Sequence, residues 1–209
     1  MCGRYYIEAD DEMIEEIRNI CAKIDAQNNA PTSSIAVGEV FPTNSAPVIT
    51  ENGPVAMKWG FPMYNSTKPI INARSETATE KPMFSAALKQ RRIVVPTSGF
   101  YEWMHVGTKS TDKYLFTLAG EKMLCLAGLY TNFARPDGTR EDCFSILTTE
   151  ANESMRPYHN RMPVYIAAGE RDAWLSDPAS VGEMLHRAQP ELNATKQVHG
   201  DHFEQLSFI

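Results

Sequence analysis

A cysteine at position 2, directly after the initiating methionine, carries the most distinctive chemistry in this chain. Because the Cys2 side chain is small, we expect methionine aminopeptidase to remove Met1 and leave Cys2 with a free α-amine. The amine and the thiol then lie on adjacent carbons. The amine can condense with an aldehyde to an imine, and the thiol can close on the same carbon to give a thiazolidine. The same pair also suits an N-terminal nucleophile hydrolase, in which the amine is the base for the thiol.

Both groups are partly nucleophilic at neutral pH, because an α-amine titrates at about 7.7–8.0 and a free thiol at about 8.5. A neighbouring carboxylate or histidine would tune them further. The candidates are polar side chains next to apolar or aromatic segments: Asn72, Glu102 and His159. Burying a carboxylate is costly unless it is paired or protonated. Glu102 is therefore either a functional residue or an outward-facing one on a half-exposed strand, and His159 is either functional or an ordinary histidine with satisfied hydrogen bonds.

The composition is that of a globular protein, with 209 residues, 43% of them hydrophobic and 22% charged. No break in composition marks a linker, so we expect a single domain over residues 1–209. No apolar run is long enough to cross a bilayer, and the N-terminus lacks the apolar stretch of a signal peptide. These features predict a cytoplasmic protein without a membrane partner.

The charge and the cysteines exclude several kinds of site. A net charge of −6 argues against non-specific nucleic-acid binding but leaves room for a local basic groove. There is no C-x-x-C pair and no glycine-rich phosphate loop, so we expect neither a metal nor a nucleotide cofactor. Cys21, Cys125 and Cys143 lie in apolar patterns and are predicted core residues. The basic residues in or near the motif segments are Arg4, Lys68, Arg74, Arg91, Arg92 and Arg161.

The hydrophobic pattern predicts strands in the middle of the chain and helices around them. Helical spacing is seen at 11–27, 81–90, 149–158, 170–175 and 180–187. Strand patterns occur at 35–37, 46–50, 55–59, 92–96, 99–104, 113–118, 123–129, 143–148, 163–166 and 197–198. We therefore expect an α+β fold, with an antiparallel or mixed sheet curled toward a barrel and flanked by short helices.

Four short segments in this order resemble the motifs of the SOS response-associated peptidase (SRAP) family, and the resemblance spans nearly the whole chain. Members begin Met-Cys-Gly-Arg and carry Asn-Ala-Arg-x-Glu-Thr, Gly-Phe/Tyr-Tyr-Glu-Trp and His-x-Arg-Met-Pro segments. The corresponding segments here are Met1-Cys2-Gly3-Arg4, Asn72-Ala73-Arg74-Ser75-Glu76-Thr77, Gly99-Phe100-Tyr101-Glu102-Trp103 and His159-Asn160-Arg161-Met162-Pro163.

The resemblance implies a sensor and shield of abasic sites in single-stranded DNA, acting as a monomer without a cofactor and associated with the nucleoid when bound to DNA. Cys2 would form a thiazolidine crosslink with the aldehyde of the ring-opened abasic sugar. Asn72 would position the nucleophile or the sugar, Glu102 would handle the protons of the amine and of the opening sugar, and His159 would act as acid or base in imine formation and in crosslink reversal. By the same resemblance, the flanking phosphates would be held by Arg4, Arg74 and Arg161, and Trp59 and Trp103 would stack on bases or form pocket walls.

The chain departs from the family pattern at three places. Asn160 stands where aspartate is common, and Ile93 stands where cysteine is frequent. In the usual Trp-Gly-x-x-Pro motif, the proline here is one place early, at Pro62. The isoleucine at position 93 affects packing. Asn160 puts a salt bridge in doubt, and the early proline at Pro62 puts a DNA contact in doubt.

Two other functions compete with the abasic-site shield. The first is a thiol peptidase or amidase, in which Cys2, Glu102 and His159 form a nucleophile–base set. The second is a plain single-strand binding module in which Cys2 is incidental, and the acidic net charge counts against it.

Overall fold

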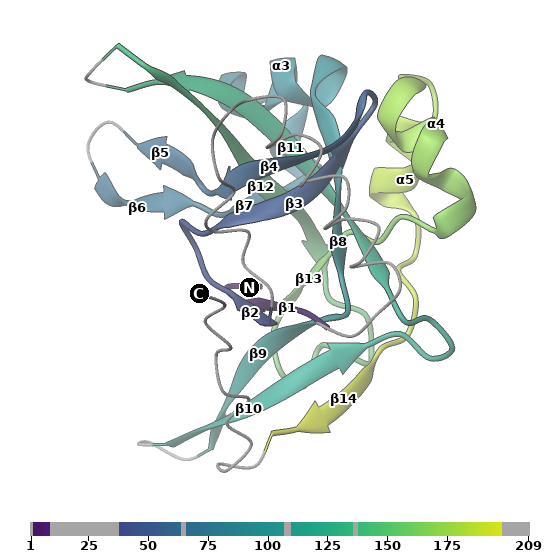
Figure 1. Ribbon diagram of the computed structural model, residues 1–209. Coiled ribbons are helices and arrows are strands. Elements are labelled where there is room, and N and C mark those ends of the chain that lie inside the picture. The colour runs from purple at the N-terminus through teal and green to yellow at the C-terminus, as the bar shows by residue number, and fades with distance from the viewer. Residues whose placement is uncertain (1, 9–37, 64–65, 107–109, 136–137, 198–209) are drawn as a thin grey trace.

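A closed ring of five strands forms the centre of the fold in the computed structural model, which describes residues 2–8, 38–63, 66–106, 110–135 and 138–197 (Figure 1). All neighbouring strands in the ring are antiparallel except β4 and β12, which are parallel. In ring order the strands are β3 (Ser45–Thr50), β4 (Gly53–Trp59), β12 (Arg140–Glu150), β11 (Leu124–Ala134) and β8 (Arg92–Thr97).

The ring separates two hydrophobic cores, because successive side chains of a strand point to opposite faces. On β8, Ile93 and Val95 belong to one core and Val94 to the other. We call the core that contains Ile93 and Val95 the inner core and the one that contains Val94 the outer core. The inner core contains Tyr5, Trp59, Ile93, Phe100, Leu126, Phe144 and Ile146. The outer core contains Phe84, Leu88, Val94, Leu129, Leu147, Trp174 and Met184.

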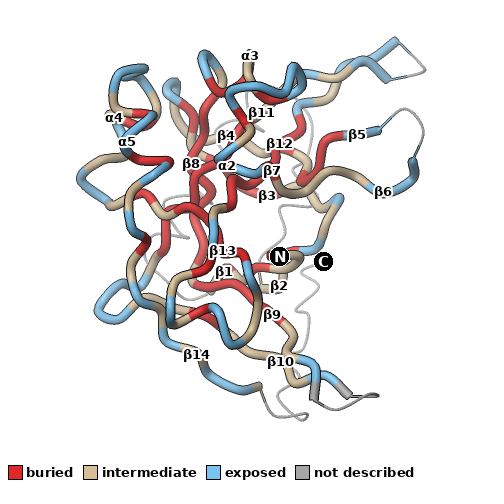
Figure 2. The backbone as a smooth tube through the Cα atoms, turned by 180° about the vertical axis from the view of Figure 1, so that it is seen from behind, coloured by how far each residue is buried: buried red, intermediate tan, exposed pale blue. Residues whose placement is uncertain are grey.

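Four helices supply side chains to the outer core: α2 (Ser75–Ala78), α3 (Pro82–Gln90), α4 (Arg171–Ser176) and α5 (Val181–His186). Helix α3 begins at Pro82, whose fixed φ suits the first helical position. A single turn, η1 (Ala168–Glu170), leads into α4. Figure 2 shows the result, with burial concentrated in the strands beneath these helices and exposure at the hairpin ends.

A second sheet lies below the ring in Figure 1 and brings the N-terminus to the inner core. Strand β1 is paired with β2 on one side and with β9 on the other, so that Tyr5 is opposite Phe100. In order, the strands are β14 (Asn193–Lys196), β10 (Ser110–Thr117), β9 (Gly99–Val106), β1 (Tyr5–Ile7) and β2 (Gly38–Val40).

Several short elements are added around β12. Strand β7 (Asn72–Arg74) pairs with it in parallel, and β13 (Arg161–Pro163) pairs with it antiparallel. Helix α2 (Ser75–Ala78) follows β7 directly. A hairpin of β5 (Phe61–Met63) and β6 (Ser66–Ile70) follows Gly60. Gly60 has φ 113°, and a Cβ there would lie 2.6 Å from Cβ of Pro69, so this corner requires glycine.

The predicted fold class is confirmed: the protein is α+β, with a barrel-like curled sheet and short flanking helices. The helices expected at 81–90, 170–175 and 180–187 are present within a residue or two. The last strand lies at Asn193–Lys196 rather than at 197–198. The predicted helix at 11–27 and strand at 35–37 lie outside the described residues. None of the described helices is long and apolar enough to cross a membrane.

The helix predicted at 149–158 is wrong. Its first two residues belong to β12, and the rest forms turns. The Asn152 side chain accepts a hydrogen bond from the backbone N–H of Met155 and donates to the carbonyl oxygens of Gln189 and Pro190. Such side-chain bonds compete with helical ones. They hold the segment that leads to His159 in an irregular conformation.

Candidate functional site

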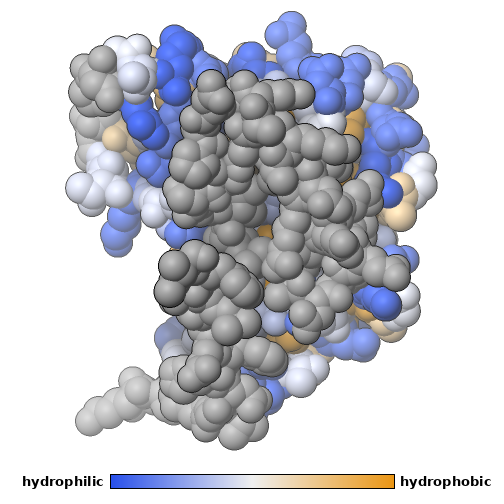
Figure 3. Space-filling model, viewed as in Figure 1, coloured by the Kyte–Doolittle hydropathy of each residue, from blue (hydrophilic) through white to orange (hydrophobic). Residues whose placement is uncertain are grey.

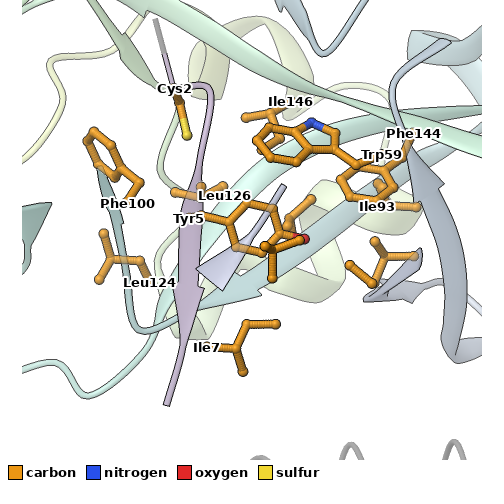
Figure 4. Close-up of a cluster of buried hydrophobic side chains, with 14 of the residues drawn as sticks. Cys2, Tyr5, Ile7, Trp59, Ile93, Phe100, Leu124, Leu126, Phe144 and Ile146 are labelled. Carbon is orange, nitrogen blue, oxygen red and sulfur yellow. The ribbon is translucent and has the colours of Figure 1, made fainter. Parts of the chain in front are cut away.

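Cys2 is fully buried and is held through its backbone. The Asn72 side chain donates a hydrogen bond from Nδ2 to the Cys2 carbonyl oxygen over 2.9 Å. The backbone N–H of Tyr101 donates to the carbonyl oxygen of Arg4 over 2.8 Å, which fixes the same segment to β9. In Figure 4 the Cys2 sulfur points into the inner core, near Phe100. Two motifs distant in sequence therefore place this residue.

Strand β12 acts as a common scaffold for two of the motifs. Asn72 is opposite Ile146 through the parallel pairing of β7. Arg161 is opposite Glu150 through β13, and His159 lies two residues before Arg161. The remaining two motifs meet through the pairing of β1 with β9, because β1 follows Cys2 and β9 carries Glu102.

Glu102 is 5% exposed and acts electrostatically on two other candidate residues. Burial raises the pKa of the Cys2 thiol well above its usual range, and the Glu102 charge raises it further. The Glu102 charge also raises the pKa of His159, against the larger effect of burial. One carboxylate thus lies within electrostatic reach of both Cys2 and His159, and the thiol is protonated at neutral pH.

The protonation of His159 follows from its burial and its hydrogen bond. Burial lowers the pKa of its imidazole, so the ring is neutral at pH 7. The backbone N–H of Arg161 donates to Nδ1 of His159 over 2.9 Å. Because a neutral imidazole carries one proton, that proton is assigned to Nε2. In this arrangement His159 offers a hydrogen-bond donor from Nε2.

Arg161, which the family resemblance predicts to hold a phosphate, is engaged inside the protein. Its guanidinium donates to both carboxylate oxygens of Glu76, over 2.7 Å and 2.8 Å, and to the Thr148 carbonyl oxygen over 2.6 Å. Its side chain is 10% exposed. The hydrogen bond from Arg161 lowers the pKa of Glu76. Arg161 therefore joins two motif segments and sets the backbone that holds His159.

The two expected tryptophans have different environments. Trp59 is fully buried, with its ring centroid 4.9 Å from that of Tyr5, and its Nε1 donates to the Ile71 carbonyl oxygen over 3.0 Å. This position fits the wall of a pocket and leaves no exposed face for stacking on a base. Trp103 is half-buried, and the Arg4 guanidinium lies 5.1 Å from its ring centroid.

The remaining two arginines differ in their partners. Arg74 is exposed, and its side chain makes no hydrogen bond or ion pair with the described residues, although its charge helps to lower the pKa of Glu76. Arg4 is half-buried and forms an ion pair with Glu39 over 3.1 Å. Glu39 also pairs with Lys113. Sequence reasoning missed Glu39 and Lys113, because they lie far apart in the chain and belong to no motif. Glu76 lay within a quoted motif, but its partner was not foreseen.

Buried polar atoms without a hydrogen-bond partner gather in the motif segments. Among the described residues they include Asn72 Oδ1, Ser75 Oγ, Thr77 Oγ1 and Arg161 Nε. Buried polar groups are rarely left without partners, so such a concentration is typical of a site that completes its hydrogen bonds with a ligand. Within the same described ranges, no three His, Cys, Asp or Glu side chains come together as metal ligands.

Solved structures share this fold. A crystal structure of a protein from Bacteroides thetaiotaomicron has a TM-score of 0.75 with this chain at 21% identity, covering 95% of this chain and 93% of that one. A second, from Bordetella bronchiseptica, also has a TM-score of 0.75 at 21% identity, with coverages of 94% and 100%.

Sequence comparison identifies the family. Residues 1–200 match the family "SOS response associated peptidase (SRAP)". Abasic site processing protein YoaM of Bacillus subtilis is 31% identical over 185 residues, covering 84% of this chain and 79% of that protein. Abasic site processing protein YedK of Escherichia coli is 26% identical over 189 residues, with coverages of 86% and 82%. The chain belongs to the SRAP family.

Proposed function

We propose that this protein processes abasic sites by forming a thiazolidine crosslink between Cys2 and the ring-opened sugar in single-stranded DNA. The observation that carries the proposal is the meeting of four distant motifs at Cys2. Asn72 holds its carbonyl oxygen, and the Glu102 charge acts on both Cys2 and His159. The names of its relatives, which are abasic site processing proteins, support the same substrate.

The reaction requires removal of Met1, so that Cys2 bears a free amine. The amine attacks the sugar aldehyde, a C–N bond forms, and one water leaves as the imine is made. The thiol then adds to the imine carbon, a C–S bond forms, and the electron pair of the C=N bond moves to nitrogen. The proton lost by sulfur is taken up by that nitrogen. The balance is one aldehyde and one aminothiol giving one thiazolidine and one water.

The geometry supports roles for four side chains. Asn72 positions the nucleophile, since it binds the backbone of Cys2 itself. Glu102 relays protons, because its carboxylate is within electrostatic reach of the thiol. His159 donates from Nε2 to the sugar oxygen that departs, since its Nδ1 already accepts the N–H of Arg161. Arg74, whose side chain is exposed, binds a flanking phosphate.

The raised thiol pKa favours this chemistry over the peptidase alternative. A thiol peptidase attacks with a thiolate, and catalytic cysteines accordingly have lowered pKa values. Burial and the Glu102 charge instead keep the Cys2 thiol protonated, and burial keeps His159 neutral. A thiolate–imidazolium pair is therefore disfavoured. In the aminothiol route the amine forms the first bond, and the thiol adds only after the imine is present.

A denaturing gel tests the proposal. The processed protein is mixed with a single-stranded oligonucleotide that carries one abasic site, and a heat-stable shifted band is expected. Cys2→Ala should abolish the band, whereas Cys125→Ala, which removes a buried thiol of the outer core, should retain it. Mass spectrometry of the starting protein is used to check that Met1 is absent. Peptide cleavage without a shifted band would favour the peptidase, and salt-sensitive binding without either would favour a simple binding module.

We also expect the protein to act as a monomer and to associate with the nucleoid when bound to damaged DNA. A reaction between one aminothiol and one sugar needs a single copy of Cys2. Light scattering of the complex with a short abasic oligonucleotide tests this expectation, and a mass corresponding to two protein chains would contradict it.

A further inference from the structure

A carboxylate with two cationic partners lies next to the Cys2 segment. Oε2 of Glu39 is 3.1 Å from Nη1 of Arg4, and Oε1 of Glu39 pairs with Nζ of Lys113. Glu39 belongs to β2 and Lys113 to β10, so three segments distant in sequence converge here. The side chains of Arg4, Glu39 and Lys113 are 29%, 30% and 24% exposed, so all three reach the surface.

Aromatic rings hold the two cations in place. The Arg4 guanidinium lies 4.0 Å from the ring centroid of Phe41 and 5.1 Å from that of Trp103. The Lys113 ammonium lies 3.8 Å from the ring centroid of Tyr101 and 5.9 Å from that of Trp103. Contacts of this kind fix the direction of a cation while leaving its charge available to an anion. The cations are therefore preorganised rather than free surface side chains.

Two further observations favour an external ligand at this place. Nε of Arg4 is buried and has no hydrogen-bond partner among the described residues, so Glu39 leaves part of the guanidinium unsatisfied. Phe41 is 41% exposed, and large exposed hydrophobic side chains are few in the described part of the chain. The described surface in Figure 3 is accordingly mainly hydrophilic. An exposed ring beside paired cations matches the base and the phosphate of a nucleotide.

We propose that Arg4, Lys113, Phe41 and Trp103 form a subsite for a nucleotide of single-stranded DNA adjacent to the abasic position, and that Glu39 occupies its phosphate position in the free protein. The inference deepens the proposed function and rests on it. The incoming phosphodiester takes over both cations from Glu39, and a base stacks on Phe41. Exposed ion pairs contribute little to stability, so the exchange is readily made. Because Glu39 competes for the two cations, it weakens binding to any strand that does not also place a base on Phe41.

A second carboxylate in the molecule provides a matched control. Glu141 also pairs with one lysine and one arginine, Lys58 and Arg135, and its side chain is 22% exposed. No aromatic ring of the described residues lies over Lys58. Glu39→Gln and Glu141→Gln therefore change the net charge equally, and each removes one anionic partner from two cations. Only the first releases cations next to Cys2.

The test measures binding of an undamaged single-stranded oligonucleotide, which forms no crosslink, by fluorescence anisotropy at several salt concentrations. Glu39→Gln should tighten binding by about three- to tenfold, and Glu141→Gln by less than about twofold. Lys113→Ala should weaken binding and reduce the slope of log K against log salt by about 0.7, whereas Lys58→Ala should leave the slope unchanged. Phe41→Ala should weaken binding without changing the slope.

Equal effects of Glu39→Gln and Glu141→Gln would overturn the inference, because the gain would then come from net charge alone. An unchanged salt slope in Lys113→Ala would also overturn it. Tighter binding by Glu39→Gln is not explained by misfolding, which lowers affinity. The proposed function fails separately: absence of a Cys2-dependent band on the abasic strand overturns the function, while normal crosslinking with no difference between the two glutamine variants overturns the subsite only.

Discussion

Buried polar side chains serve opposite purposes on the two sides of the strand ring. In the outer core, Arg92 is 5% exposed and donates to four backbone carbonyl oxygens. Two of these belong to the end of α3, at Leu88 and Lys89, and two to the end of α4, at Trp174 and Leu175. One guanidinium thus caps two helices, which satisfies carbonyl groups that lack partners at a helix end.

The polar groups of the motif segments are incompletely satisfied by comparison. Asn72 uses Nδ2 to hold Cys2, while its Oδ1 has no partner among the described residues. Arg161 binds Glu76 through both carboxylate oxygens, while its Nε has none within the same ranges. A saturated buried charge stabilises the fold, whereas an incompletely bonded one retains capacity for a ligand. The difference separates structural from functional polar residues more clearly than burial alone.

Among substitutions that keep the Cys2 aminothiol, Glu102→Gln should give the largest functional effect. The substitution keeps the shape of the side chain but removes its charge and its ability to accept a proton. The initial rate of crosslinking should fall by about 10²- to 10⁴-fold, the usual contribution of a proton-transfer group. The rate is measured as band intensity against time on a denaturing gel. A rate within twofold of wild type would remove the assigned role.

Arg92→Met should give the largest effect on stability. Four carbonyl oxygens at the ends of α3 and α4 lose their donor, and at about 1 kcal/mol for each hydrogen bond the free energy of unfolding should fall by about 3–5 kcal/mol. Urea denaturation measures this loss. The crosslinking rate per folded molecule should stay unchanged. A fall in that rate would show that the outer core and the candidate site are energetically coupled.

Glu76→Gln should affect both properties to an intermediate extent. Losing the bidentate pair leaves Arg161 buried without its anion, so stability at pH 7 should fall by about 1–3 kcal/mol. Crosslinking should slow by about tenfold, because Arg161 supplies the N–H that orients His159. Glu76→Asp serves as the control that keeps the charge, and it should recover part of the rate.

The same pair predicts an acid dependence. Arg161 lowers the pKa of Glu76 in the folded protein, so the pair stabilises above the unfolded pKa of about 4.3 and its contribution is lost as pH falls toward the folded value. The difference in unfolding free energy between wild type and Glu76→Gln should therefore shrink between pH 5 and pH 3. A difference that stays constant with pH would contradict the ion pair.

His159→Gln should give the smallest effect on stability. Burial lowers the pKa of His159 in the folded protein, so the unfolded chain binds the proton first as pH falls below about 6.5. Wild type should lose stability between pH 7 and the folded pKa, and the variant should lose less. Urea midpoints at pH 7.5 and 5.5 test this. An equal loss in both proteins would show that His159 titrates normally.

The sequence predicted the elements and residues whose signals are local. The alternating and apolar segments became the ring strands, and Cys2, Asn72, Glu102 and His159 are linked in the structure by a hydrogen bond and by charge. The three-residue strands β1, β7 and β13 were missed or only partly foreseen, because so short a segment becomes a strand only when a partner is present.

The contacts that the sequence did not foresee at the site have the same origin. Arg161 was expected to hold a phosphate, and a sequence does not show that Glu76, 85 residues away, accepts two of its hydrogen bonds. Trp59 was expected to stack on a base or to form a pocket wall, and the ring formed by β4 and its neighbours encloses it. Periodicity indicates that a residue is buried, but long-range pairing decides what it contacts.

The anchoring of position 2 by its main chain has a consequence for engineering. Asn72 donates a hydrogen bond to the main-chain carbonyl oxygen of Cys2, so this contact does not depend on the side chain at position 2. Serine installed there would leave the amine in the same location and supply an oxygen in place of sulfur. Under the proposed reaction, such a chain would capture aldehydes as an adduct that hydrolyses more readily than the thiazolidine.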